Sequence, residues 1–64
     1  NANFKNAKLL RANFNHANLT NADLSGADLR KAFLGGADLS NANLDSAILD
    51  GANLKCKNHP ICLD

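Results

Sequence analysis

The sequence predicts an all-β solenoid, in which short extended segments turn at regular intervals and stack as coils. Alanine recurs every five residues from Ala2 to Ala52, and a large apolar residue follows each alanine two positions later. A period of five fits neither a continuous helix, with about 3.6 residues per turn, nor a strand, whose faces alternate with a period of about two. A chain that turns once per unit does fit, and repeated turning in one sense produces a solenoid.

Eleven five-residue units cover residues 2–56. Alanine and the apolar residue lie two apart, so they share one face of a short extended segment. The two residues that follow the apolar residue are mostly Asn, Asp, Ser, Gly, Lys or Arg. Several of these residue types favour turns. The apolar residues are Phe4, Leu9, Phe14, Leu19, Leu24, Leu29, Leu34, Leu39, Leu44, Leu49 and Leu54. The position between alanine and this residue is Asn or Asp in eight of eleven units, with Lys8, Phe33 and Ile48 as exceptions.

The unit Ala-(Asp or Asn)-Leu-x-x resembles the pentapeptide-repeat family, most clearly at residues 22–26 (ADLSG) and 37–41 (ADLSN). The resemblance implies a right-handed quadrilateral parallel β-helix with about four units and about twenty residues per coil. Eleven units divided by four give about 2.75 coils. Residues twenty apart are then expected to stack. We therefore predict a β-helix over residues 1–55 and a short C-terminal capping segment over residues 56–64.

Composition argues against several function classes. The chain has 64 residues, a net charge of +1 and no dense run of Lys and Arg, whereas nucleic-acid-binding domains usually carry a clustered basic surface. No apolar stretch approaches the roughly 20 residues that span a bilayer. The predicted interior of Ala and Leu leaves no room for a substrate, and no nucleophile sits beside a base. We predict no catalytic, metal-binding or cofactor-binding residues, and therefore no enzyme.

The remaining function class is a non-catalytic structural or protein-interaction module. We expect a protein partner or self-association through exposed coil ends, with no nucleic acid, membrane or small-molecule substrate. Leu10, Phe33 and Ile48 occupy outward positions and form the predicted partner surface. The resemblance also implies an alternative, a DNA-mimicking regulator that binds an enzyme such as DNA gyrase. The members with that role are longer and strongly acidic, so the short length and the charge of +1 disfavour it.

The N-terminal coil starts with no cap before Ala2, and the first residue is Asn rather than Met. We expect either a longer natural chain or another subunit over this end.

Cys56 and Cys62 lie in the predicted cap and flank five residues that include His59. A disulfide would close a short loop, and the loop-entropy model assigns it about 2–2.5 kcal/mol. A zinc site has only three ligands in Cys56-x-x-His59-x-x-Cys62, where four are usual. A redox pair usually has about two residues between its cysteines, and free thiols are the fourth reading. We favour the disulfide, which together with the resemblance favours a thylakoid-lumen, periplasmic or extracellular location over the cytoplasm.

Overall fold

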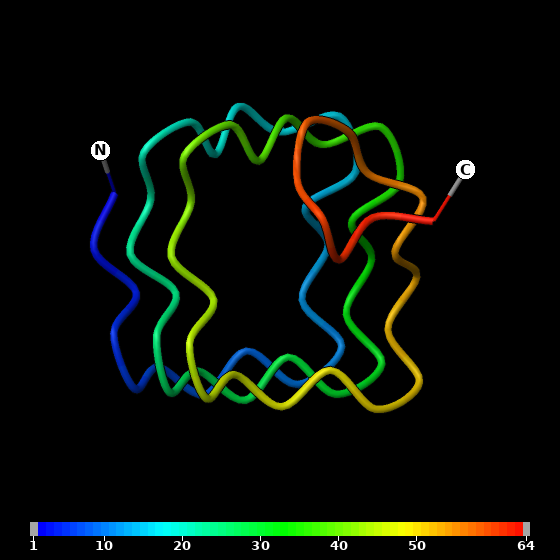
Figure 1. Cartoon of the computed structure of the whole chain (residues 1–64). Helices are drawn as coiled ribbons and strands as arrows, with labels where there is room; N and C mark the ends of the chain where they lie inside the picture. Colours follow the sequence, from blue (N-terminus) through cyan, green and yellow to red (C-terminus); the bar gives the residue numbers. More distant parts are fainter. Residues whose placement is uncertain (1, 64) are drawn as a thin grey trace.

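The computed structural model describes residues 2–63 of the chain; residues 1 and 64, the outer bounds of the two predicted segments, lie outside this range. Figure 1 shows the chain as roughly square coils stacked along one axis, with each side running beside the corresponding side of the next coil. Residues 2–63 form no helix and no strand longer than one residue. Accordingly, this range holds no helix with the length and apolarity to cross a membrane.

Neighbouring coils are joined by isolated parallel bridges, one on each side of the square. Seven of the eight bridges join residues twenty apart, which is the register expected from four units per coil. The bridges are Asn3–Asp23, Lys8–Asp28, Asn13–Phe33, Asn18–Asp38, Asp23–Asn43, Asp28–Ile48, Phe33–Asn53 and Asp38–Lys57.

All five backbone N–H groups of a central unit are satisfied, as residues 22–26 illustrate. One donates across the preceding corner, one to the coil before, two to the coil after, and one to a side chain of the same unit. The pairs are Ala22 to the Leu19 carbonyl (3.0 Å), Asp23 to Ala2 (2.9 Å), Leu24 to Asn43 (2.7 Å), Gly26 to Asp45 (2.8 Å) and Ser25 to the Asp23 carboxylate (3.0 Å). This arrangement explains how a chain without Val can satisfy its backbone hydrogen bonds in an extended conformation.

Each corner is a four-residue turn with a left-handed residue at its third position. Its closing bond runs from the alanine N–H to the carbonyl of the apolar residue three positions earlier. A positive φ at this position defines a type II turn, which favours Gly and Asn. The corner residues with positive φ are Asn6, Arg11, His16, Asn21, Gly26, Lys31, Gly36, Asn41, Ser46 and Gly51.

The hydrophobic core is concentrated in the middle coil. Its four leucines, Leu24, Leu29, Leu34 and Leu39, are all 0% exposed. The equivalent apolar residues of the first and third coils are only partly buried, apart from Leu19. Since a fully buried Leu contributes about 1.5–3 kcal/mol, the middle coil carries most of the hydrophobic stabilisation.

The last corner is one residue shorter than the others. Lys57, rather than residue 58, bridges Asp38, and its N–H donates to the Ala37 carbonyl as residues following an alanine do elsewhere. Cys56 therefore takes the inward alanine position and is 8% exposed. The backbone ladder thus continues through Lys57 before the chain folds back over the end of the third coil.

Candidate functional site

In eight units, the Asn or Asp that precedes the apolar residue caps the corner that follows it. Its side-chain oxygen accepts a hydrogen bond from the backbone N–H two residues later, at 2.9–3.2 Å. This is an Asx-turn, and it satisfies the one N–H of the unit that has no backbone partner. The capping residues are Asn3, Asn13, Asn18, Asp23, Asp28, Asp38, Asn43 and Asn53. These repeated polar residues therefore serve the fold.

Three corners lack this cap because the preceding side chain offers no suitable oxygen. They follow Lys8, Phe33 and Ile48, and the affected N–H groups belong to Leu10, Gly35 and Asp50. The Gly35 N–H donates instead to Asn15 Oδ1 of the coil before, at 2.9 Å. The N–H groups of Leu10 and Asp50 have no partner within residues 2–63. Both lie at the same corner of the square, two coils apart.

The predicted partner surface consists of exposed side chains with polar neighbours. Leu10 is 50% exposed, Phe33 46% and Ile48 45%. Along the stacking direction, Leu10 adjoins Arg30 and Ile48 adjoins Asp28. Phe33 lies between Asn13 and Asn53. Single apolar residues among polar ones are common on protein surfaces. A partner role for these three residues stays a prediction.

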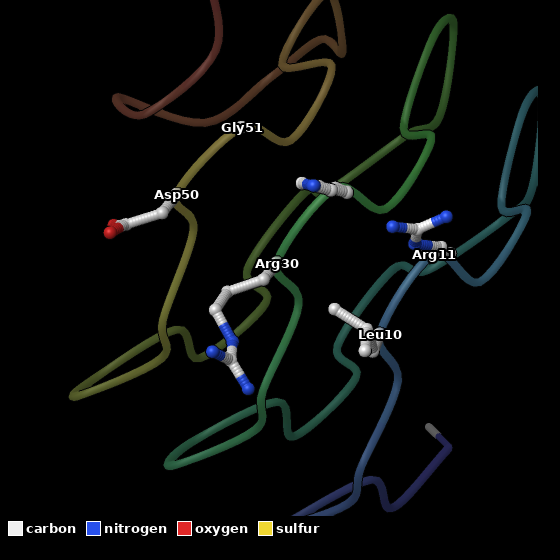
Figure 2. Close-up of a pocket in the computed structure, with 6 residues that line it drawn as sticks. Leu10, Arg11, Arg30, Asp50 and Gly51 are labelled. Carbon is white, nitrogen blue, oxygen red and sulfur yellow. The ribbon is translucent and has the colours of Figure 1, made fainter.

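A shallow groove of about 340 Å³ lies at the corner where Leu10 is exposed. Figure 2 shows its lining residues on three successive coils. They are Leu10 and Arg11 on the first coil, Arg30 and Lys31 on the second, and Asp50 and Gly51 on the third. We call this feature the corner groove. Its lining carries three cationic side chains and one carboxylate.

One of these cations is already neutralised. Arg30 donates from Nε to Asp28 Oδ1 (2.9 Å) and from a terminal nitrogen to Oδ2 (2.7 Å). This paired contact lowers the pKa of Asp28 and raises the pKa of Arg30, to which Asp50 adds a smaller effect. Arg11 and Lys31 make no ion pair with any described residue. The uncompensated positive charge of the groove therefore lies on these two side chains.

Two other carboxylates are held by serine hydroxyls. Ser25 and Ser40 donate from Oγ to Asp23 and Asp38 at 2.6 Å. The Asn58 side-chain amide also donates to Asp38, at 3.1 Å. The Ser40 hydroxyl, then the Asn58 amide, hold the pKa of Asp38 at about 2. The ionised form of Asp38 thus ties the C-terminal segment to the second coil.

The first coil presents an open end. The rings of Phe4 and Phe14, from opposite sides of the square, meet edge to face with centroids 5.5 Å apart. Both rings stay partly exposed. The backbone N–H groups of Lys8, Asn13 and Asn18 have no partner within residues 2–63. A bare ladder edge thus surrounds a partly exposed aromatic pair.

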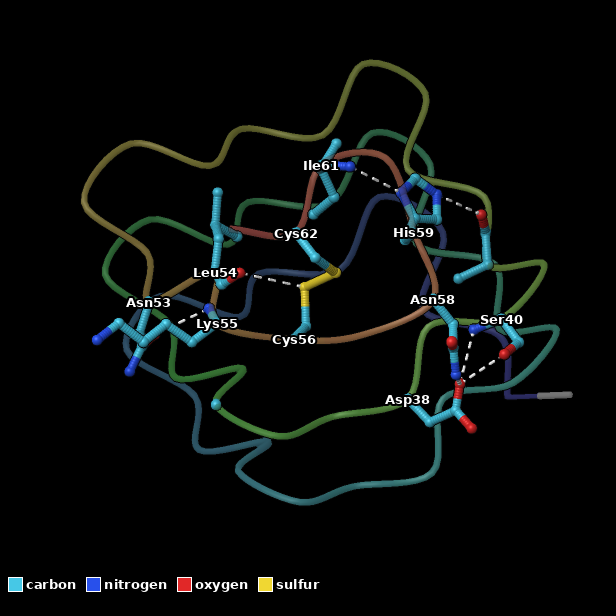
Figure 3. The surroundings of a disulfide bond; sticks show 12 residues. Asp38, Ser40, Asn53, Leu54, Lys55, Cys56, Asn58, His59, Ile61 and Cys62 are labelled. Atoms are coloured by element: carbon cyan, nitrogen blue, oxygen red, sulfur yellow. Dashed lines mark hydrogen bonds between the residues drawn. A yellow bond between two sulfur atoms is a disulfide. The ribbon is translucent and has the colours of Figure 1, made fainter. Parts of the chain in front are cut away.

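At the opposite end the C-terminal segment folds back over the third coil, and Figure 3 shows its contacts. Cys56 and Cys62 form a disulfide with Cα atoms 5.1 Å apart, as predicted. His59 Nε2 lies 3.0 Å from the Ala42 carbonyl, and the Ile61 N–H donates to His59 Nδ1 at 3.3 Å. With both sulfurs bonded to each other and both imidazole nitrogens engaged, these three residues do not form the alternative zinc site. No cluster of metal ligands occurs elsewhere in residues 2–63.

The family model for pentapeptide repeats matches residues 1–36 and 22–55, with eight copies of the repeat. The chain belongs to the pentapeptide-repeat family. No curated protein matches the chain.

Solved pentapeptide-repeat structures share its fold. The protein Rfr23 from the cyanobacterium Cyanothece 51142 is 46% identical, with a TM-score of 0.76 over 78% of this chain and 34% of its own. HetL from Nostoc sp. strain PCC 7120, involved in heterocyst differentiation regulation, is 43% identical, with a TM-score of 0.59 over 84% of this chain and 28% of its own. A protein from the Arabidopsis thaliana thylakoid lumen is 37% identical, with a TM-score of 0.54 over 98% of this chain and 52% of its own. The chain thus spans 28% to 52% of these structures.

The corner groove is the feature of this pentapeptide-repeat chain that sequence reasoning missed. The available signal was the twenty-residue spacing, which places Lys31 directly after Arg11 in one corner column. Applying that spacing to the charged residues, and not only to the leucines, would have identified the groove.

Proposed function

We propose that this chain is a non-catalytic structural module that binds protein through the open end of its first coil. The four leucines of the middle coil are 0% exposed, so binding has to use the outer faces or the coil ends. The proposal includes the finer architecture implied by the family, a right-handed quadrilateral β-helix of about 2.75 coils with a short C-terminal cap.

The observation that carries the proposal is the bare ladder edge of the first coil. In the later coils, the N–H groups equivalent to those of Lys8, Asn13 and Asn18 donate to carbonyls of the coil before. Unpaired edges of this kind accept a strand from another chain by β-augmentation. Burying the partly exposed Phe4 and Phe14 rings would add apolar stabilisation to such a contact.

The first partner to test is a second copy of the chain. The C-terminal segment folds over the third coil, with Leu63 donating to the Leu54 carbonyl at 2.7 Å and His59 contacting Ala42. The N–H groups of Leu44, Ser46 and Leu49 also have no partner within residues 2–63, but this segment stands in the way of another chain at that end. We therefore propose that two copies meet first coil to first coil in a two-fold arrangement. The first coil carries Lys5, Lys8 and Arg11 and no acidic residue, so like charges face each other. Added salt screens that repulsion and should strengthen the association.

Sedimentation velocity across a concentration series tests the contact. Lys8→Pro removes an N–H that makes no bond within the described chain, whereas Lys8→Thr removes the same charge but keeps the N–H. We expect reversible self-association that strengthens with salt, weakens in Lys8→Pro and persists in Lys8→Thr. Thermal melts of both variants check that the fold is retained. A strictly monomeric chain, or equal association of the two variants, contradicts binding through this edge.

A further inference from the structure

We propose that the corner groove binds one oxyanion of the phosphate type, either free or carried by a small ester, between Arg11 and Lys31. This site lies on an outer corner rather than at a coil end, so it is independent of the protein-binding function proposed above.

The first reason is the stacking of like charges. Arg11 and Lys31 occupy equivalent positions in adjacent coils, and the Arg11 N–H donates to the Arg30 carbonyl one residue before Lys31. Coils joined by such bonds lie about 4.7–4.9 Å apart, a separation at which adjacent like charges are destabilising. A bound anion between the two side chains would convert this repulsion into two attractions.

The second reason is the backbone conformation of the same residues. Arg11 has φ 62° and Lys31 has φ 60°, in the left-handed region that favours Gly and Asn. The other described corners place Asn, Gly, Ser or His at this position. Two long cations are therefore held in an unfavourable conformation at one corner, and strained residues of this kind gather at binding sites.

The third reason is that the groove offers one neutral donor and the space for a ligand. The Leu10 N–H lacks an Asx cap because Lys8 replaces the usual Asn or Asp, and it has no partner within residues 2–63. Gly51, in the next coil after Lys31, keeps the corner open, since a Cβ there would lie 3.2 Å from Lys31 Cγ. Exposed N–H groups beside cations are a common arrangement for binding oxyanions.

The charges around the groove limit what fits. Arg30 is already paired with Asp28, which leaves Arg11 and Lys31 for the ligand. Asp50 lines the groove on the third coil and repels a second anionic group there. Its carboxylate accepts hydrogen bonds, so a ligand that carries hydroxyl groups beside one phosphate complements the groove best.

The test is an NMR titration of the isotopically labelled chain with inorganic phosphate and with glycerol 3-phosphate, at constant ionic strength set with sodium chloride. We expect saturable shifts of the Leu10, Arg11 and Lys31 amides. Tighter binding of glycerol 3-phosphate assigns the site to esters, and equal binding assigns it to free phosphate. Either result supports an oxyanion site. Shifts spread evenly over all Lys and Arg residues, including Lys5 and Lys55, overturn it.

Glycine variants separate binding from folding. Arg11→Gly and Lys31→Gly remove a cation and also place glycine in a left-handed conformation, so we expect each variant to melt at a higher temperature. Each should lose about ten-fold in phosphate affinity, the size of one charge-assisted hydrogen bond. Ser46→Gly is the matched control, because it relieves φ 60° at another corner and should leave phosphate binding unchanged. Unchanged affinity in both cation variants overturns the proposal.

Discussion

Replacing Leu29 by alanine should destabilise the fold far more than the same change at Leu9 or Leu49. The three residues form one interior column, but Leu29 is 0% exposed while its two neighbours are only partly buried. Leu→Ala in a rigid core costs about 2–5 kcal/mol, and coils on both sides of Leu29 prevent collapse around the cavity. We therefore expect about 3–5 kcal/mol at Leu29 and about 1–2 kcal/mol at each end.

Thermal and urea unfolding followed by circular dichroism measure this gradient, with the disulfide kept oxidised. A domain of this size has a total stability of roughly 3–10 kcal/mol, so Leu29→Ala should remove a large part of it. Each kcal/mol corresponds to about 4–8 °C in melting temperature. Equal losses at all three positions, or a larger loss at Leu9 than at Leu29, would refute the stacking of three coils with a buried middle layer.

Three further perturbations test other parts of the fold. Ser46→Gly should raise the unfolding free energy by up to about 1–2 kcal/mol, because glycine accepts φ 60°; Gly26→Ala should lower it, because φ is 69° and a Cβ would press on the Asn6 side chain. The pKa of Asp38, about 2 against an ordinary 3.8, is depressed, so its ionised form stabilises the fold fully above about pH 4–5 and loses that effect as the pH falls toward 2. Melts across this pH range should show a smaller decline in Asp38→Asn. Reducing the Cys56–Cys62 disulfide should lower the unfolding free energy by about 2 kcal/mol, measured by melts with and without reductant.

The coil register could be predicted from the sequence because one small residue marks every unit. Alanine occupies the inward corner position in all eleven units, so its unbroken spacing from Ala2 to Ala52 records each turn of the chain. The bridges between residues twenty apart agree with that register. The Cys56–Cys62 bond agrees with the predicted disulfide, which needed only two cysteines close in sequence.

Other features of the fold could not be predicted, because they depend on contacts across the square or on a break in the five-residue period. Cys56 replaces alanine after four residues instead of five, and nothing in the sequence indicates that Lys57 then continues the ladder. The edge-to-face contact of Phe4 and Phe14 requires knowing that two opposite sides of the square reach each other. The capping role of the Asn and Asp residues is not predicted either, because turn roles are expected only for the two corner residues of each unit.

Amide hydrogen exchange, residue by residue, tests the stacked-coil account most directly. Asp28, Phe33 and Asp38 occupy the same position of the unit as Lys8, Asn13 and Asn18, but their N–H groups donate to the coil before at 2.8–3.0 Å. The account predicts slow exchange at the first three and fast exchange at the second three, in spite of identical places in the repeat. Equal protection of the two sets would contradict it.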